Sequence, residues 1–169
     1  MKRRIVVLAI SLLTVPLVVA TVSSGSSDDR RVLEFDVMAP VSEPFTGATN
    51  AIRGVPGGGL PWEIDAATGE LRGDGRLEVE VDGLVLARRA PVPAALQGTN
   101  PIASFKAIVS CLTSDGGAPA TLNLSTALVP ASSSGDAKIE GAVGLPSPCF
   151  APIVFVTSPG GAWFAVTGR

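Results

Sequence analysis

The sequence predicts an all-β protein, an antiparallel β-sandwich of about seven to nine strands with one disulfide. Short segments alternate apolar and polar residues, which is the period of a half-buried strand. Clusters of Gly, Pro, Ser, Asn and Asp separate these segments, often by about 8–12 residues, and no window has the period of a long amphipathic helix. An open β-barrel is the alternative architecture, because the same strand spacing is typical of barrels.

The amino-terminus has the three parts of an export signal. A basic start at 2–4 precedes an apolar run at 5–20, and Ala20 fits the small-residue rule for cleavage. The run is too short and wrongly flanked for a membrane anchor. Arg3-Arg4 allows a twin-arginine signal as the alternative, but the flanking residues fit that motif poorly. We expect a secreted, extracellular protein with a signal peptide at 1–20, a disordered mature amino-terminus at 21–30 and one sandwich domain at 31–169.

The mature chain is acidic and has no histidine. Removing the three basic residues at 2–4 from 13 Lys and Arg leaves ten against 15 Asp and Glu, a net charge of about −5. This charge argues against nucleic acid and anionic membranes as partners. Without histidine there is no Ser-His-Asp triad, no Cys-His pair and no histidine-ligated zinc or haem. We expect no catalysis and no cofactor.

The strands follow from alternation, taken along the chain. Each predicted strand turns its apolar residues inward and its polar residues to solvent. In order, the strands and their inward residues are 31–38 (Leu33, Phe35, Val37), 61–65 and 69–72 joined by 66–68 with Gly69 suited to the positive φ of a turn, 76–82 (Leu77, Val79, Val81), 104–112 (Phe105, Ala107, Val109, Cys111), 121–128 (Leu122, Leu124, Leu128), 138–145 (Ile139, Gly141, Val143, Leu145), and a closing hairpin at 153–157 and 162–167.

Turn chemistry joins these strands. Gly combines with Asp or Ser at 73–75, 115–117 and 132–136. In the closing hairpin, Pro159 presets φ for the second position of a type II turn and Gly160 supplies the positive φ of the third. Both strands of that hairpin are apolar on nearly every residue, so we place them in the middle of the packed structure.

The apolar phase changes at Gly83. Leu84 and Leu86 would point to the acidic side if the register of the preceding strand continued. We expect a β-bulge at Gly83 that returns both leucines to the core.

Two long segments have no sustained periodicity. They lie at 39–60 and 88–101 and are rich in Gly, Pro, Ser and Thr or in Pro and Ala. Loops of this length inside a compact domain are usually functional or mobile. We expect them to form the recognition surface.

The chain contains two cysteines, Cys111 and Cys149. In an exported domain two cysteines favour a disulfide. Cys111 shares an apolar strand face, and Cys149 comes just before the most apolar strand. The bridge should therefore hold the closing hairpin to the rest of the sandwich.

Acidic residues are candidates for calcium binding and for catalysis. Glu78, Glu80 and Asp82, with Asp74 nearby, have no EF-hand spacing, and same-face residues along a strand lie nearly 7 Å apart. We expect a solvated sheet face. A glycosidase needs two carboxylates at a set separation. The five glutamate candidates are Glu63, Glu70, Glu78, Glu80 and Glu140, and nothing in the sequence brings a particular pair together.

The two tryptophans are candidates for stacking on sugar rings. Trp163 lies inside an apolar strand and is expected in the core. Trp62 follows a Gly-rich stretch and is the candidate ligand contact; packing under the 39–60 loop is the competing interpretation.

Two tripeptides match recognition motifs. Arg72-Gly73-Asp74 spells an integrin-binding sequence, but turns select Gly and Asp, so a structural turn is the better interpretation. Asn123-Leu124-Ser125 is a glycosylation sequon on an outward strand face, which matters only in a host that glycosylates exported proteins.

Several stretches together resemble a known group of proteins. They are Gly54 to Trp62, Gly75 to Leu86, Lys106 to Leu112 and Leu145 to Gly168. They are similar to an uncharacterised family of small secreted bacterial β-rich proteins with one disulfide. The resemblance implies secretion and the disulfide, and it implies no activity, ligand or catalytic residue.

The expected function is a non-catalytic binding or surface-structural role outside the cell. The partner would be an extracellular glycan or protein, without nucleic acid and without a stable membrane anchor after signal cleavage. The alternative is a small secreted carboxylate-dependent hydrolase acting on polysaccharide.

Overall fold

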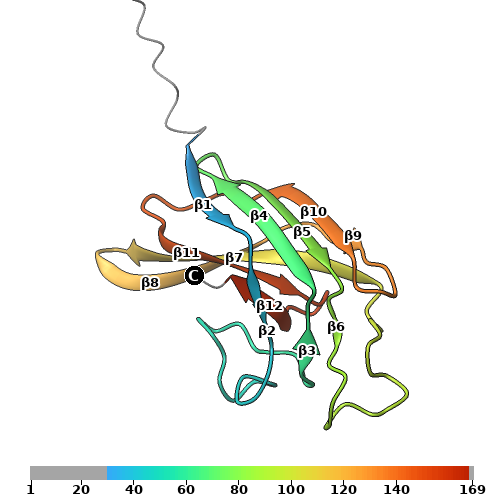
Figure 1. The fold of residues 1–169 in the computed structure, drawn as a ribbon. Helices are drawn as coiled ribbons and strands as arrows, with labels where there is room; N and C mark the ends of the chain where they lie inside the picture. Colours follow the sequence, from blue (N-terminus) through green and yellow to red (C-terminus); the bar gives the residue numbers. More distant parts are fainter. Residues whose placement is uncertain (1–29, 168–169) are drawn as a thin grey trace, which may run out of the picture.

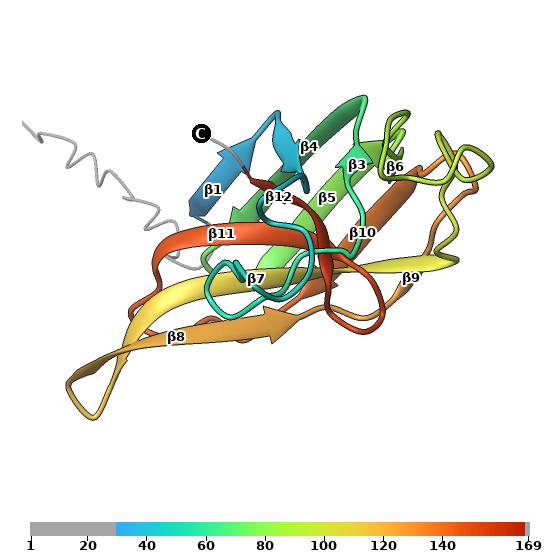
Figure 2. The ribbon, with the colours of Figure 1, turned by 90° about the horizontal axis from the view of Figure 1, so that it is seen from below.

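The computed structural model describes residues 30–167, and within that range the chain forms twelve strands and no helix (Figure 1). The predicted signal peptide at 1–20 and residues 21–29 lie outside the described residues. The strands form two antiparallel sheets that face each other as a sandwich and do not close into a barrel (Figure 2). The predicted all-β sandwich is confirmed.

Each sheet is assembled from distant parts of the sequence. The smaller sheet has the order β1 (Arg31–Phe35), β4 (Ala66–Arg72), β5 (Arg76–Asp82) and β10 (Ala137–Ala142). The larger sheet has the order β2 (Met38–Pro40), β12 (Trp163–Thr167), β11 (Phe150–Thr157), β7 (Ser104–Asp115) and β8 (Ala118–Ser125), with β9 (Val129–Pro130) also pairing with β7. A separate short ladder joins β3 (Trp62–Glu63) and β6 (Val85–Leu86).

The core lies between the two sheets, where the alternation predicts it. Leu77, Val79 and Val81 of β5 are buried, and the acidic residues between them are exposed. On β7, all four residues predicted inward, Phe105, Ala107, Val109 and Cys111, are also buried. Strand β11 lies between β12 and β7, which confirms the central position expected of a strand that is apolar on both faces.

The first predicted strand is wrong in its second half. The chain leaves the smaller sheet after Phe35 and enters the larger sheet at Met38. This change of sheet shifts the phase of alternation. Val37, predicted inward, is therefore 49% exposed, while Met38 is buried.

The connection predicted at 66–68, with a turn at Gly69, is also wrong, because β4 already begins at Ala66. Strand β4 runs unbroken through this glycine, which pairs with Phe35 of β1. A Cβ atom at Gly69 would lie 2.5 Å from Cζ of Phe35. The glycine leaves room for that ring inside the sheet.

Strand β8 is less buried than its alternation predicts. It is the edge strand of the larger sheet, and the β7–β8 hairpin extends beyond the smaller sheet (Figure 2). Leu122 is 39% exposed and Leu128, which lies past the end of the strand, is 51% exposed. Both are predicted inward. No strand of the smaller sheet covers the overhang that carries Leu122, whereas Leu128 lies at the opposite end of β8, in the connection to β9.

The closing hairpin has a different turn from the predicted one. The Gly161 amide donates to the Ser158 carbonyl at 3.0 Å, and the positive φ of 91° belongs to Gly161 rather than to Gly160. Without a positive φ at its third position the turn is not type II. The hairpin itself, β11 against β12, is confirmed.

The segment at 41–61 is an ordered strap over the outer face of the larger sheet. The Trp163 amide donates to the Pro56 carbonyl and the Gly58 amide to the Trp163 carbonyl, both at 2.8 Å. Arg53 Nη1 donates to the carbonyls of Ser110 at 3.0 Å and Ala151 at 2.9 Å. The strap explains why β11 and β12 are apolar on nearly every residue.

Gly83 ends a strand rather than bulging within one. Strand β5 stops at Asp82, Gly83 has a φ of 65°, and the chain turns into the β3–β6 ladder. Leu84 and Leu86 are buried as predicted, but Val85 between them is buried too. The predicted bulge is therefore wrong, although its consequence for the two leucines is right.

Replacing Gly83 with Val is expected to lower the free energy of unfolding by about 1–3 kcal/mol. A β-branched residue is strained at positive φ, and a Cβ atom would lie 2.3 Å from Oδ2 of Asp65. Chemical denaturation measures the loss. Gly144→Val is the control, because its Cβ would meet nothing within 4 Å. Equal midpoints for the two variants would contradict the prediction.

Candidate binding face and loops

Four glutamates form one row across the outer face of the smaller sheet. The register pairs Glu34 with Glu70, Glu70 with Glu78, and Glu78 with Glu140, so the row crosses all four strands. Directly opposed residues have Cβ atoms about 4.5–5.5 Å apart, and like charges at that distance repel. We name Glu34, Glu70, Glu78 and Glu140 the glutamate row.

Three basic side chains form ion pairs with the four glutamates of the row. Arg31 contacts Glu34 at 2.5 Å and Glu70 at 3.1 Å, and Arg72 contacts Glu70 at 2.7 Å. Lys138 Nζ lies 2.7 Å from a Glu140 oxygen and 2.9 Å from a Glu78 oxygen. These are solvent-exposed pairs, and such pairs contribute little to stability individually.

The ion pairs favour the charged forms of Glu70 and Lys138. The hydrogen bond from Arg72 is the main cause that lowers the pKa of Glu70, and the coulombic attraction of Arg72 and Arg31 adds to it. Hydrogen bonds to Glu140 and then to Glu78 raise the pKa of Lys138. The row is thus a set of four carboxylates bridged by Arg31, Arg72 and Lys138.

Two open hollows lie on this face. One of about 530 Å³ is lined by acidic side chains from β1, β4 and β5 together with Thr68, Gly69 and Phe35. The other, of about 300 Å³, lies on the far side of Glu70 and Glu78. Among residues 30–167 no group of three or more acidic, Cys or His side chains could hold a metal ion.

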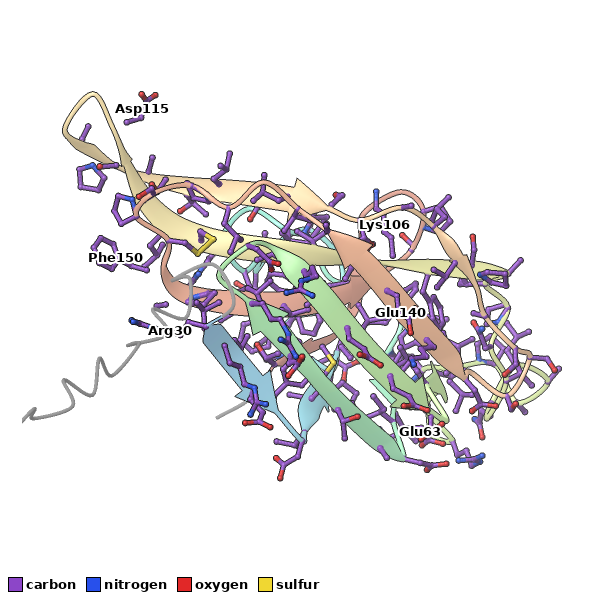
Figure 3. The ribbon with its side chains drawn as sticks, turned by 90° about the horizontal axis from the view of Figure 1, so that it is seen from above. Arg30, Glu63, Lys106, Asp115, Glu140 and Phe150 are labelled. Carbon is purple, nitrogen blue, oxygen red and sulfur yellow. A yellow bond between two sulfur atoms is a disulfide. The ribbon has the colours of Figure 1, made fainter. Side chains whose placement is uncertain are left out.

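The structure separates the five glutamate candidates. Glu70, Glu78, Glu80 and Glu140 share the outer face of the smaller sheet, whereas Glu63 belongs to β3 and pairs with Arg88. Figure 3 shows Glu63 apart from Glu140. Sequence reasoning missed Glu34. The turn at 73–75 could have placed Glu70 opposite Glu78, but no local signal pairs β1 with β4.

Trp62 is not at the surface. Its side chain is 4% exposed and stacks on Phe164 with ring centroids 3.9 Å apart. Phe105 contacts the same indole edge-on at 6.4 Å. The ring therefore offers no face to a sugar. A Cβ atom at Gly58 would lie 3.3 Å from its Nε1, which agrees with the competing interpretation, packing under the 39–60 loop. Trp163 is buried as predicted.

The Arg72-Gly73-Asp74 turn has its charged groups engaged. Asp74 accepts the Arg76 amide at 3.0 Å and Arg76 Nε at 2.5 Å. The backbone hydrogen bond is the largest cause that lowers the pKa of Asp74. Arg72 is held by Glu70. These contacts are those of a structural turn.

Cys111 and Cys149 are joined by a disulfide, with Cα atoms 5.0 Å apart. Cys111 lies on β7 and Cys149 one residue before β11, its neighbour in the larger sheet. Figure 3 shows the bridge beside the labelled Phe150. The predicted bridge is confirmed, and it fixes the point where the chain returns from β10 to the larger sheet.

The 88–101 loop is closed and anchored. The Leu86 amide donates to the Thr99 carbonyl at 3.0 Å, and the Gly98 amide donates back to the Leu86 carbonyl at 2.8 Å. Val92 is buried beneath the loop, and Gln97 Nε2 donates to its carbonyl at 3.0 Å. Leu96 is left 39% exposed at the surface. Such loops, compact and tied at their ends, are frequently functional.

Asp136 organises the 132–136 turn beside Gly83. Its carboxylate accepts the Gly83 amide at 3.0 Å and the hydroxyls of Ser134 at 2.7 Å and Ser132 at 3.0 Å. The Gly83 amide is the largest cause that lowers the pKa of Asp136, and the two hydroxyls lower it further. The folded state therefore favours the ionised form.

Asp136→Asn is expected to lower the denaturation midpoint at pH 7, and the difference from wild type should shrink as the medium becomes acidic. A carboxyl whose folded pKa lies below its unfolded value of about 3.9 stabilises the protein above that value. This contribution is lost as the pH falls through the folded pKa. Denaturation from pH 7 to pH 2 measures it, with Asp115→Asn at the exposed hairpin tip as control. A difference independent of pH would contradict the prediction.

Asn123 of the glycosylation sequon is exposed on β8. Its Nδ2 donates to the Arg53 carbonyl at 2.9 Å, so the side chain lies toward the strap on the outer face.

Within residues 30–167 no helix is long and apolar enough to cross a membrane.

Comparisons with known proteins add no relative to this description. A scan against protein-family models finds no matching family, and searches of curated proteins and of solved structures find no match.

Proposed function

We propose that this chain is a secreted, non-catalytic binding protein that recognises an extracellular protein through its 88–101 loop. The observation that carries the proposal is the closed and anchored form of the loop, with an exposed leucine at its surface. A loop fixed before binding loses little conformational entropy when a partner docks. Recognition residues are commonly found on loops held by a rigid scaffold.

The surface chemistry of the loop favours a protein partner over a glycan. Leu96 is exposed together with the neighbouring Pro and Ala side chains at 93–95, and Arg89 is exposed near the start of the loop. Arg is enriched among the residues that carry affinity at protein interfaces, and the buried centre of such an interface is more apolar than its rim. Both tryptophans, the usual stacking platforms for sugars, are buried.

Secretion is part of the proposal. The basic and apolar start at 1–20 has the form of an export signal. The disulfide is typical of proteins that fold in an oxidising compartment.

A carboxylate-dependent hydrolase acting on polysaccharide is the second candidate, favoured by the glutamate row. Opposed glutamates such as Glu70 and Glu78 have Cβ atoms about 4.5–5.5 Å apart, within reach of the carboxyl separation of about 5–5.5 Å that retaining glycosidases use. A glycosidase acid, however, needs a raised pKa. Arg72 lowers the pKa of Glu70 instead, which supports the binding role.

The test compares the mature chain with two variants, Leu96→Asp in the loop and Val37→Asp as the matched control. Val37 is an exposed aliphatic residue outside the loop, in the β1–β2 connection. Each protein is cross-linked to secreted and surface proteins of the producing organism and applied to an array of glycans and cell-wall polymers. We expect one cross-linked protein with wild type and Val37→Asp, its loss with Leu96→Asp, and no signal on the array.

Two outcomes would contradict the proposal. Binding to a polymer on the array that survives Leu96→Asp would assign recognition to a glycan and to another surface. Release of sugars from a polysaccharide that is abolished by Glu70→Gln or Glu78→Gln would establish the hydrolase.

A further inference from the structure

The four outer strands of the two sheets protect their edges to different degrees. Unpaired edge strands invite pairing with other chains, and proteins usually guard them with charge, proline or short length. In the smaller sheet β1 carries Arg31 and Glu34, and β10 carries Lys138 and Glu140. In the larger sheet β2 has three residues and ends at Pro40.

Strand β8 lacks these safeguards over most of its length. It has eight residues, none of them charged, and the sequence carries no charged side chain between Asp115 and Asp136. Its one proline, Pro119, lies at the start of the strand. Figure 2 shows no strand beyond β8, on the side away from β7. The edge is therefore long, neutral and open.

The register shows which backbone groups of β8 face outward. The Thr126 amide donates to the Ala107 carbonyl at 3.0 Å, and the pairing continues without a shift from Ser125 opposite Ile108 to Ala118 opposite Asp115. In an antiparallel pair the hydrogen-bonded positions alternate. The even-numbered residues of β8 thus bond to β7. Thr121, Asn123 and Ser125 direct their backbone N–H and C=O groups to the open edge.

The side chains of β8 divide into an apolar and a polar face. Leu122 and Leu124 lie opposite Cys111 and Val109, on the face turned toward the smaller sheet, and Leu122 remains exposed there. Thr121, Asn123 and Ser125 lie on the other face and are all exposed. The strand is therefore amphipathic without charge.

We propose that a second copy of this chain pairs with β8 through its own β8, antiparallel, about a two-fold axis at Asn123. This alignment places the outward backbone groups of Thr121, Asn123 and Ser125 against those of Ser125, Asn123 and Thr121 of the second copy. Leu122 then lies opposite Leu124 of the second copy, and Leu124 opposite its Leu122. Both leucine pairs occupy non-hydrogen-bonded positions, where opposed side chains are closest.

The composition of β8 favours its own copy over a different extended segment. In a two-fold pair centred on Asn123, position 121 meets position 125 of the second copy and Asn123 meets itself, so a charge at 123, or two like charges at 121 and 125, would oppose a like charge. A neutral strand avoids this repulsion. The alignment at Asn123 also matches leucine with leucine on one face and small polar residues with each other on the other face.

The dimer goes beyond the proposed function and does not depend on it. The 88–101 loop lies away from the tip of the β7–β8 hairpin (Figure 2), so each can act without the other. A strand pair of five residues from each copy buries less surface than a standard interface, which buries about 1,600 Å² in total. We therefore expect a weak dimer that forms at about 10–100 μM.

The test is a charge exchange at Thr121 and Ser125, measured by sedimentation equilibrium of the mature chain. In Thr121→Lys/Ser125→Lys, position 121 of one copy faces position 125 of the other, so two pairs of lysines oppose each other across the interface. In Thr121→Lys/Ser125→Glu, the same positions bring lysine against glutamate. We expect wild type and the Lys/Glu variant to dimerise, and the Lys/Lys variant to dissociate with a dissociation constant raised about tenfold or more.

Circular dichroism and the denaturation midpoint check that both variants fold, which is expected because both residues are exposed. A wild-type chain that stays monomeric at about 1 mM, well above the expected range, would overturn the pairing and leave the edge to another extended segment. A dimer that tolerates Lys/Lys, or one that Lys/Glu disrupts equally, would overturn the alignment at Asn123. Loss of partner binding by Leu96→Asp has no bearing on these outcomes, so the two proposals fail separately.

Discussion

Removing the bridge between Cys111 and Cys149 is expected to lower the free energy of unfolding by about 2–5 kcal/mol. The two residues are 38 apart in sequence, and the closed loop contains β8, β9 and β10. Strand β10 belongs to the smaller sheet, and β8 and β9 pair with β7. The bridge therefore restricts the conformations of this loop in the unfolded chain, and the strands of the loop belong to both sheets in the folded protein.

Two preparations separate the covalent effect from the loss of sulfur packing. The Cys111→Ala/Cys149→Ala variant removes the crosslink and the packing of the sulfur atoms, whereas reduced wild type loses only the crosslink. Denaturation of wild type with and without reductant measures the effect of the crosslink. The further loss in the variant measures the effect of sulfur packing, because Cys111 is fully buried. Identical midpoints for oxidised and reduced wild type would contradict a stabilising bridge.

Local patterns predicted those parts of the fold that local contacts determine. The alternation of Leu77, Val79 and Val81 suffices because β5 lies between two partners in the middle of its sheet. The turn residues at 73–75 join β4 to β5, the next strand in the sequence. The cysteines could be paired from composition, since the chain has only two.

The errors arose where distant segments decide burial. Val37 is exposed because the chain changes sheets, and Leu122 because β8 extends beyond the smaller sheet. Gly69 lies in a strand because Phe35, from another strand, fills the space of its missing side chain. None of these contacts can be inferred from the few residues on either side of Val37, Leu122 or Gly69.

The candidate site shows the same division. Each glutamate of the row was visible as an outward residue, but the row depends on β1 and β10 flanking the β4–β5 hairpin. Those pairings join residues far apart in sequence. The closed form of the 88–101 loop likewise depends on the backbone of Leu86, which precedes the loop and bonds to Gly98 and Thr99 near the loop's carboxyl end.

Replacing Trp62 with Ala is expected to lower the free energy of unfolding by about 3–5 kcal/mol. The indole stacks on Phe164 of β12 and meets Phe105 of β7 edge-on, so its loss opens a cavity beside two strands of the larger sheet. The Trp62 amide also donates to the Val41 carbonyl at 2.9 Å, at the start of the strap. Neighbouring backbone therefore has little freedom to collapse into the space.

Two variants sharpen this test by chemical denaturation. Trp62→Phe keeps an aromatic ring in the stack and should recover a large part of the loss. Phe45→Ala, which removes a half-exposed ring that contacts Trp163, should cost less than Trp62→Ala. A surface ring that serves a ligand would show the opposite pattern, because its truncation leaves stability within about 0.5 kcal/mol and removes binding. A denaturation midpoint for Trp62→Ala close to that of wild type would therefore favour Trp62 as a ligand contact. A large fall in the midpoint that Trp62→Phe largely reverses would assign Trp62 to the packing between β3 and the larger sheet.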